Sequence, residues 1–137
     1  MLTLHDRRDP LSFDAARRSV DRALERAGVT LEQIGFFEYH DAYSIYAALS
    51  LEAAGFAERG KGWQLAHDNE IALDGRIPCA IAGGLKARGY PGGATGVYQA
   101  VEAATKLRSD SGASEVAMIQ SLGGPASTAV THILASV

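Results

Sequence analysis

Apolar residues recur in three parts of the chain at the three- to four-residue spacing of an amphipathic helix. This spacing predicts helices over residues 11–27, about 44–54 and 97–107. Ser12 fits the N-cap of the first helix, and Gly28 and Gly55 follow the first two helices as C-terminal residues. Thr30-Leu31-Glu32-Gln33 has the residue order of a capping box, which predicts a short helical turn.

Short, continuous apolar runs bounded by turn residues indicate buried strands. Runs of this kind lie at residues 34–39, 77–81, 116–122 and 129–134. Gly123-Gly124-Pro125 joins the last two runs, and so short a turn predicts that they pair antiparallel. Because helices and strands alternate along most of the chain, we expect a layered α/β fold.

Composition favours one globular domain covering residues 1–137, since 47% of the residues are hydrophobic and 21% are charged. A net charge of -3 and scattered basic residues give no reason to expect nucleic acid as a partner. Cys79 is the single cysteine, which excludes an internal disulfide framework and a cysteine-based zinc site. We find no spacing typical of metal ligands, no signal peptide and no membrane-spanning run, and therefore expect a cytoplasmic protein without a metal.

Glycine is concentrated between Gly83 and Gly96, where it supplies six of fourteen residues. Glycine permits a positive φ and lets a ligand or another backbone approach closely. It also loses more conformational entropy on ordering than any other residue. A segment this rich in glycine is therefore a costly connection between two elements, and we interpret it as part of a functional site.

The same segment resembles the GGLKA-x-GHP-x-GATG signature of thiolases, above all the sterol-carrier-protein type. The similarity covers nearly the whole chain, from Asp6 to Val137, and is to the C-terminal half of a thiolase. This resemblance implies a mixed five-stranded sheet with helices on both faces. The family's first strand would lie upstream of residue 3, so we expect it to be short or missing here, leaving an open sheet edge.

His40-Asp41-Ala42-Tyr43 follows the first predicted strand and resembles the HDCF or HDAF motif of sterol-carrier-type thiolases. Ligands of open α/β sheets gather at the carboxyl ends of strands. The resemblance implies that His40 donates to a thioester oxygen, directly or through water, and that Asp41 orients the loop or the imidazole. The alternative is that both residues cap the following helix.

Tyr90 stands where the family has the histidine that takes a proton from the nucleophilic cysteine. A phenol is a poor base at neutral pH, although nearby cations such as Lys86 and Arg88 favour its ionised form. Those two cations are also candidates to meet a phosphate of coenzyme A. The alternative for Tyr90 is an aromatic side chain that fills the hollow of the glycine segment.

Ser121-Leu122-Gly123-Gly124 corresponds to the family's C-x-G segment, with Ser121 in place of a cysteine that acts as acid and base. The backbone N–H of Gly123 would still supply an oxyanion hole, whereas the alternative is a plain turn between strands. We expect Cys79 to be a buried structural thiol. The resemblance names as catalytic His40, Tyr90 and Gly123, and as substrate-binding Asp41, Gly83, Gly84, Gly93 and Ser121.

Three functions are compatible with this resemblance. The first is the C-terminal domain or subunit of a thiolase-like acyl-CoA enzyme, incomplete without the half that carries the nucleophilic cysteine. Its substrate would be a coenzyme A thioester, with no covalently bound cofactor. The second is part of a retro-aldolase that cleaves steroid or acyl-CoA side chains, with Tyr90 as base. The third is a subunit that binds acyl chains or completes an assembly without catalysis.

All three functions imply association with other chains, because half of a shared core exposes apolar surface. The expected partner is a thiolase N-terminal half or a full thiolase chain. For the retro-aldolase, the resemblance adds a small zinc-ribbon/OB-fold protein of the DUF35 type. We expect an oligomer in each case, and neither nucleic acid nor a membrane as partner.

Overall fold

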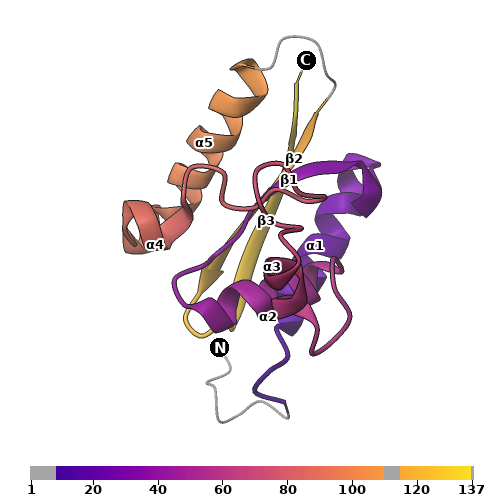
Figure 1. The fold of residues 1–137 in the computed structure, drawn as a ribbon, viewed down its shortest axis with the longest axis vertical. Coiled ribbons are helices and arrows are strands. Elements are labelled where there is room, and N and C mark those ends of the chain that lie inside the picture. The colour runs from indigo at the N-terminus through magenta and orange to yellow at the C-terminus, as the bar shows by residue number, and fades with distance from the viewer. Residues whose placement is uncertain (1–8, 110–114, 137) are drawn as a thin grey trace.

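The computed structural model describes residues 9–109 and 115–136, and the expected first strand lies outside these ranges. Helices and strands alternate along the chain as predicted (Figure 1). In chain order the elements are α1 (Asp14–Ala27), η2 (Leu31–Gln33), β1 (Ile34–Glu38), α2 (Ser44–Ala54), α3 (Gly62–His67), α4 (Gly84–Arg88), η3 (Gly92–Ala94), α5 (Thr95–Ser109), β2 (Val116–Gly123) and β3 (Thr128–Ala135).

A mixed sheet with the order β1-β2-β3 forms the centre of the described structure. β1 pairs parallel with β2, and β2 pairs antiparallel with β3 across the short turn, as the sequence predicts. The sheet is smaller than the expected five strands within the described residues. The run at residues 77–81 contributes a single bridge, between Cys79 and Phe37, rather than a strand. Pro78 has no N–H to donate and Ala80 has a φ of 49°, so regular pairing cannot continue there.

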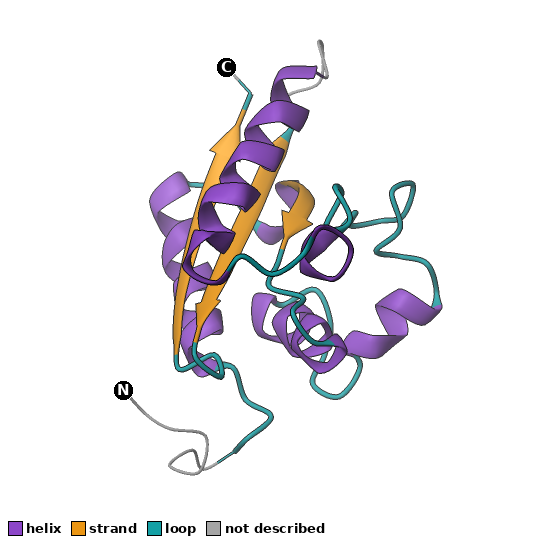
Figure 2. Cartoon of the chain, turned by 90° about the vertical axis from the view of Figure 1, so that its left-hand side faces the viewer, coloured by secondary structure: helices purple, strands orange, loops and turns teal. Residues whose placement is uncertain are grey.

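Helices cover both faces of the sheet, as expected. α1 packs against β3, and α5 packs against β2 from the other side. In Figure 2 the long helix lying over the two long strands is α5, with α1 behind them. Neighbouring aromatic residues of β1 point to opposite faces, because side chains alternate along a strand. Phe37 joins the core beneath α1 and α2, whereas Phe36 packs with Ala103 and Leu107 of α5.

Local sequence signals set most of the helix limits. Gly28 and Gly55 adopt left-handed conformations, with φ of 67° and 93°, and end α1 and α2 as predicted. Both bonds of the predicted capping box form at η2. The N-cap of α1 is Phe13 rather than the predicted Ser12, whose hydroxyl instead donates to the Asp14 carboxylate.

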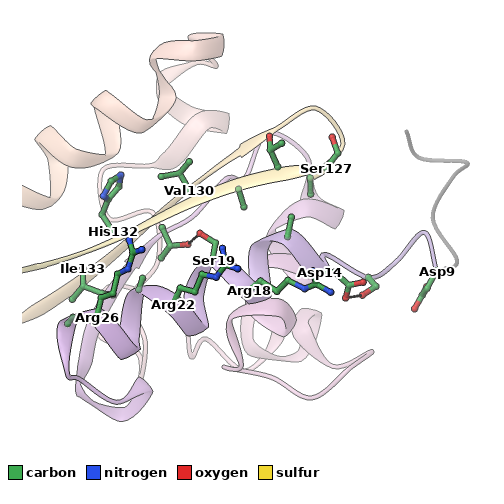
Figure 3. A pocket seen from close by; sticks show the side chains of 18 residues that line it. Asp9, Asp14, Arg18, Ser19, Arg22, Arg26, Ser127, Val130, His132 and Ile133 are labelled. Atoms are coloured by element: carbon green, nitrogen blue, oxygen red, sulfur yellow. Dashed lines mark hydrogen bonds between the residues drawn. The ribbon is translucent and has the colours of Figure 1, made fainter. Parts of the chain in front are cut away.

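Within the described residues, β3 has β2 as its one strand neighbour. The open edge expected from a short first strand depends on residues 1–8, which lie outside the described ranges. A groove of about 1160 Å³ lies between α1 and β3. Figure 3 shows Arg18, Arg22 and Arg26 along its α1 wall, opposite Val130 and His132 of β3. No helix in the described part of the chain is both long and apolar enough to cross a bilayer.

Candidate functional site

The residues singled out in the sequence meet at the carboxyl ends of β1 and β2. These strands are parallel neighbours, so their carboxyl ends lie at the same edge of the sheet. His40 and Asp41 follow β1 after one intervening residue, Tyr39, while Ser121 and Gly123 lie in the last part of β2. In Figure 1 the loop that leads from β1 to α2 passes beside the turn between β2 and β3. The glycine segment reaches this edge through α4.

His40 is buried, with 2% of its surface exposed, and its Nδ1 accepts a long hydrogen bond of 3.5 Å from the Leu122 N–H. In the neutral imidazole this bond leaves the proton on Nε2. Burial lowers the pKa of His40, and the nearby Asp41 charge opposes that effect in part. His40 is therefore a neutral imidazole at neutral pH, able to donate one hydrogen bond from Nε2.

Tyr90 lies against His40. The two rings meet edge to face, with centroids 5.2 Å apart and planes at 86°. Tyr46 approaches the same imidazole, with its ring centroid 6.3 Å away. Because 56% of Tyr90 is exposed, it does not fill a closed hollow in the glycine segment. The structure thus brings a surface phenol and a buried imidazole together although 50 residues separate them in the sequence.

The two cations that flank Tyr90 in the sequence are bonded to other side chains. Lys86 Nζ donates to the Ser44 hydroxyl. Arg88 donates from Nε and Nη2 to the two carboxylate oxygens of Glu102, the second bond being 3.0 Å long. The Arg88 guanidinium also lies over the Tyr98 ring. Arg88 therefore holds α4 to α5 rather than contacting the phenol of Tyr90.

Asp41 binds the glycine segment instead of capping α2. Its Oδ1 accepts a 2.8 Å hydrogen bond from the Leu85 N–H, in the first turn of α4. α2 begins after Tyr43 without a side-chain cap, so the capping interpretation of His40 and Asp41 is wrong. Gly84 lies directly beneath the carboxylate with a φ of 64°, and a Cβ there would stand 2.4 Å from Asp41 Oδ2. Only glycine fits this position.

The predicted substrate-binding residues Gly83 and Gly93 differ in how close they lie to the contact between Asp41 and α4. Gly83, with a φ of 94°, is the N-cap of α4, and a Cβ there would touch the Ala87 side chain. Gly93 is exposed, and no atom lies within 4 Å of where its Cβ would be. The structure therefore places Gly83 at the start of α4, directly before the glycine that meets Asp41, and leaves open space around the Cβ position of Gly93.

Gly123 and Ser121 occupy the last part of β2. Gly123 pairs with Thr128, and a Cβ on Gly123 would lie 2.2 Å from the Thr128 hydroxyl oxygen. Ser121 faces the start of α5, where a Cβ added to Gly96 would be 3.5 Å from the serine Cβ. The turn that closes β2 is thus a tight strand connection, and it also brings Gly123 next to the Leu122 amide that binds His40.

Sequence reasoning missed Glu38, a carboxyl group at the end of β1 with 1% of its surface exposed. Its Oε1 accepts a 2.7 Å hydrogen bond from the Ile81 N–H. Burial is the main reason that the pKa of Glu38 rises from its ordinary value near 4.5 to about 7. The signal in the sequence is a single acidic residue inside the apolar run of residues 34–39.

The remaining candidates for a functional site in the described ranges are a cysteine, possible metal ligands and the groove beside β3. Cys79 is buried as expected, and burial raises the pKa of its thiol far above the ordinary value. No group of three or more His, Cys, Asp or Glu side chains within residues 9–109 and 115–136 could hold a metal ion. The groove of Figure 3 is lined by none of the residues at the carboxyl ends of β1 and β2 that are described above.

Comparison with known proteins gives a consistent result. A family model described as "Thiolase C-terminal domain-like" matches residues 1–136. An acetyl-CoA acetyltransferase of Methanothermobacter thermautotrophicus is 40% identical over 137 residues, covering 96% of this chain and 36% of that protein. Sterol carrier protein 2 of Oryctolagus cuniculus is 32% identical over 106 residues, covering 77% of this chain and 19% of that protein.

The solved structure of an "Ltp2-ChsH2(DUF35) aldolase" superposes with a TM-score of 0.85 and 22% identity. The match covers 98% of this chain and 35% of that chain, and at this identity it shows the fold alone. The chain spans about a third of the length of the acetyl-CoA acetyltransferases that it matches.

Replacing Gly84 with alanine should destabilise the protein by about 2–4 kcal/mol, since a Cβ there combines a left-handed backbone with a clash against Asp41. Gly93→Ala is the matched control, because open space surrounds that position and no positive φ is required. Urea unfolding of both variants measures the difference. Equal midpoints for the two variants would show that the contact between Asp41 and Gly84 does not constrain the fold.

Glu38→Gln should change how stability depends on pH. Because the native state holds the Glu38 proton more tightly than the unfolded chain, stability falls as pH rises from about 4.5 to about 7. The glutamine variant lacks this loss, so it should gain about 3 kcal/mol relative to the parent between about pH 4 and pH 8. Urea unfolding across this range tests the expectation, and parallel stability curves would contradict it.

Proposed function

The chain belongs to the thiolase C-terminal domain-like family, and from this membership we propose that it works as the C-terminal part of an acyl-CoA enzyme. The remaining part of the enzyme would be an N-terminal half, carried by a second chain or by the rest of a longer one. The length of the relatives supports this proposal, because the chain corresponds to 36% of an acetyl-CoA acetyltransferase.

The observation that carries the proposal is a site with a hydrogen-bond donor and no nucleophile of its own. His40 can donate from Nε2, but the one thiol of the chain is unsuited to attack a thioester. Cys79 is buried, donates its S–H to the Ile77 carbonyl, and has a pKa raised by burial, which keeps it protonated. Acyl transfer at this edge of the sheet therefore requires a nucleophile from elsewhere.

α5 has an exposed apolar face near the candidate site, and this face supports the proposal of a partner that binds there. α5 begins at the site, and its inner face packs on the sheet through Ala103 and Leu107. Val97, Tyr98 and Val101 lie on the outer face, and 65% of Val97 and 60% of Val101 are exposed. Residues at this spacing share one side of a helix. We infer that the N-terminal half covers this face and places its nucleophile near His40.

In the assembled enzyme, the thioester oxygen would lie within reach of His40 Nε2 and of the Gly123 N–H. Both groups are donors, and both become more effective as negative charge grows on that oxygen. The neutral state of His40, which burial enforces, keeps it a donor that carries no net charge of its own. Ser121 and the glycines of residues 83–93 would line the path of the acyl group or of coenzyme A.

A specific observation favours the retro-aldolase as a second candidate. Tyr90 replaces the expected histidine, and its ring rests against His40. An aldol cleavage needs no thiol: a tyrosinate would take the proton from a β-hydroxyl group, and the bond between the α and β carbons would break. The electron pair would pass into an enolate whose oxygen His40 supports. A zinc-ribbon/OB-fold protein is the partner proposed for this reaction. The non-catalytic binding subunit is the outcome if neither reaction occurs.

Val101→Glu should weaken binding of the N-terminal half by at least about tenfold, because it would place a charge in the middle of the proposed interface. Leu73→Glu is the matched control, since it makes the same kind of change at an exposed residue away from α5. Native mass measurement on the complex purified from its source identifies the partner, and calorimetry gives the affinities. Unchanged affinity for the Val101 variant would exclude this face.

Tyr90 variants in the complete complex separate the candidate reactions. For acyl transfer, Tyr90→His should increase coenzyme A release from acetoacetyl-CoA by about tenfold or more, because imidazole is the better base at neutral pH. For aldol cleavage, Tyr90→Phe should lower the rate by about a hundredfold or more. The chain alone should release no coenzyme A. If His40→Ala and Tyr90→Phe changed no reaction, the non-catalytic interpretation would stand.

A further inference from the structure

Two buried carboxylates leave the end of β1 and bind backbone N–H groups of the same distant segment. Glu38 binds the Ile81 N–H at 2.7 Å, and Asp41 binds the Leu85 N–H at 2.8 Å. Their exposed fractions are 1% and 6%. The two amides lie on either side of Ala82-Gly83-Gly84, where the backbone turns into α4. The carboxylates thus hold this turn at both of its ends.

This arrangement replaces a regular strand pairing. The chain approaches the turn through residues 77–81, which make only one bridge to β1. Ala80 has a φ of 49°, which a residue with a Cβ keeps only where the surroundings hold it, whereas Gly83 and Gly84 take up their positive φ without strain. Beyond the bridge, the carboxylates of Glu38 and Asp41 hold the backbone of residues 81–85 through side-chain hydrogen bonds.

We propose that Glu38 is a positioning residue for the candidate site: its carboxylate fastens Ile81, fixes the start of the glycine segment, and so holds Tyr90 against His40. The inference rests on the proposed function in treating Tyr90 and His40 as the working pair. Asp41 fixes the far end of the turn, so the two carboxylates act as a clamp with two separate contacts.

The surroundings of Glu38 make its contact sensitive to protonation. Arg88 of α4 favours its charge, while Glu102 of α5 and Asp41 of the following loop oppose it. Cys79 and Tyr39 also lie close enough to interact with it. With burial, these neighbours bring the pKa of Glu38 to about 7. A carboxylate accepts a stronger hydrogen bond than a neutral acid does, so the contact with Ile81 tightens as pH rises through this range.

Ionisation of Glu38 affects its hydrogen bond to Ile81 and the stability of the whole fold in opposite directions. Ionising Glu38 strengthens its bond to Ile81 but lowers the stability of the whole fold, because a charge is then buried. A residue that merely filled space would produce neither effect. Because the two effects differ in sign, measurements at increasing pH distinguish the local contact of Glu38 with Ile81 from the stability of the whole fold.

The test is a titration of the full 137-residue chain followed by NMR, from about pH 5.5 to about pH 8.5. The Ile81 amide proton should shift with a midpoint near 7, and the Tyr90 ring signals should shift with the same midpoint. Glu38→Gln should lose both transitions, and the protection of the Ile81 amide from hydrogen exchange should fall about tenfold. Glu115→Gln, a matched change at the far end of the sheet beside Gly35, should leave both transitions in place.

The outcomes decide the proposal without any activity measurement. An Ile81 transition without a Tyr90 transition would overturn the positioning role. Transitions that persist in Glu38→Gln would assign them to another group, such as His40, and would also overturn it. If the transitions occur as expected but the assembled complex neither transfers acyl groups nor cleaves aldols, the clamp stands and the proposed function fails.

Discussion

The parallel pairing of β1 with β2 is the constraint on which the candidate site depends. Phe37 and Glu38 pair with Met118 and Ile119, so the two strands end at the same edge of the sheet. The chain continues from one strand into His40 and Asp41 and from the other into Gly123 and its turn. A shift of the register by one residue would turn Phe37 and Glu38 to the opposite faces and separate the imidazole from the Leu122 amide.

Hydrogen bonds of buried polar side chains then fix the loops at the ends of these strands. A carboxylate or imidazole taken out of water is costly unless a partner satisfies it. Glu38, Asp41 and His40 each find that partner in a backbone N–H from another part of the chain. Backbone donors cannot rotate away as side chains can. The site is therefore defined by main-chain geometry, and at Gly84 the close approach of the Asp41 carboxylate leaves room for glycine alone.

The sequence predicted the elements whose signals are local. α2 begins and ends at the predicted residues, and the turn after β2 makes the expected antiparallel pair. The run at residues 77–81 was misread because hydrophobicity alone ignores the missing N–H of Pro78 and the strained Ala80. Glu38 was missed for a different reason: its partner amide lies 43 residues further on, and no local pattern reports so distant a contact. Clustering of His40 with Tyr90 followed from the family resemblance and not from spacing.

The ion pair between Arg88 and Glu102 has a mechanical consequence. Only 15% of each side chain is exposed, and two parallel hydrogen bonds resist rotation of one helix against the other. The ion pair therefore ties α4, which leads to Tyr90, to the helix that carries Val97 and Val101 on its outer face. A partner bound on that outer face would contact the helix to which the segment before Tyr90 is fastened, through a link that lies outside the sheet.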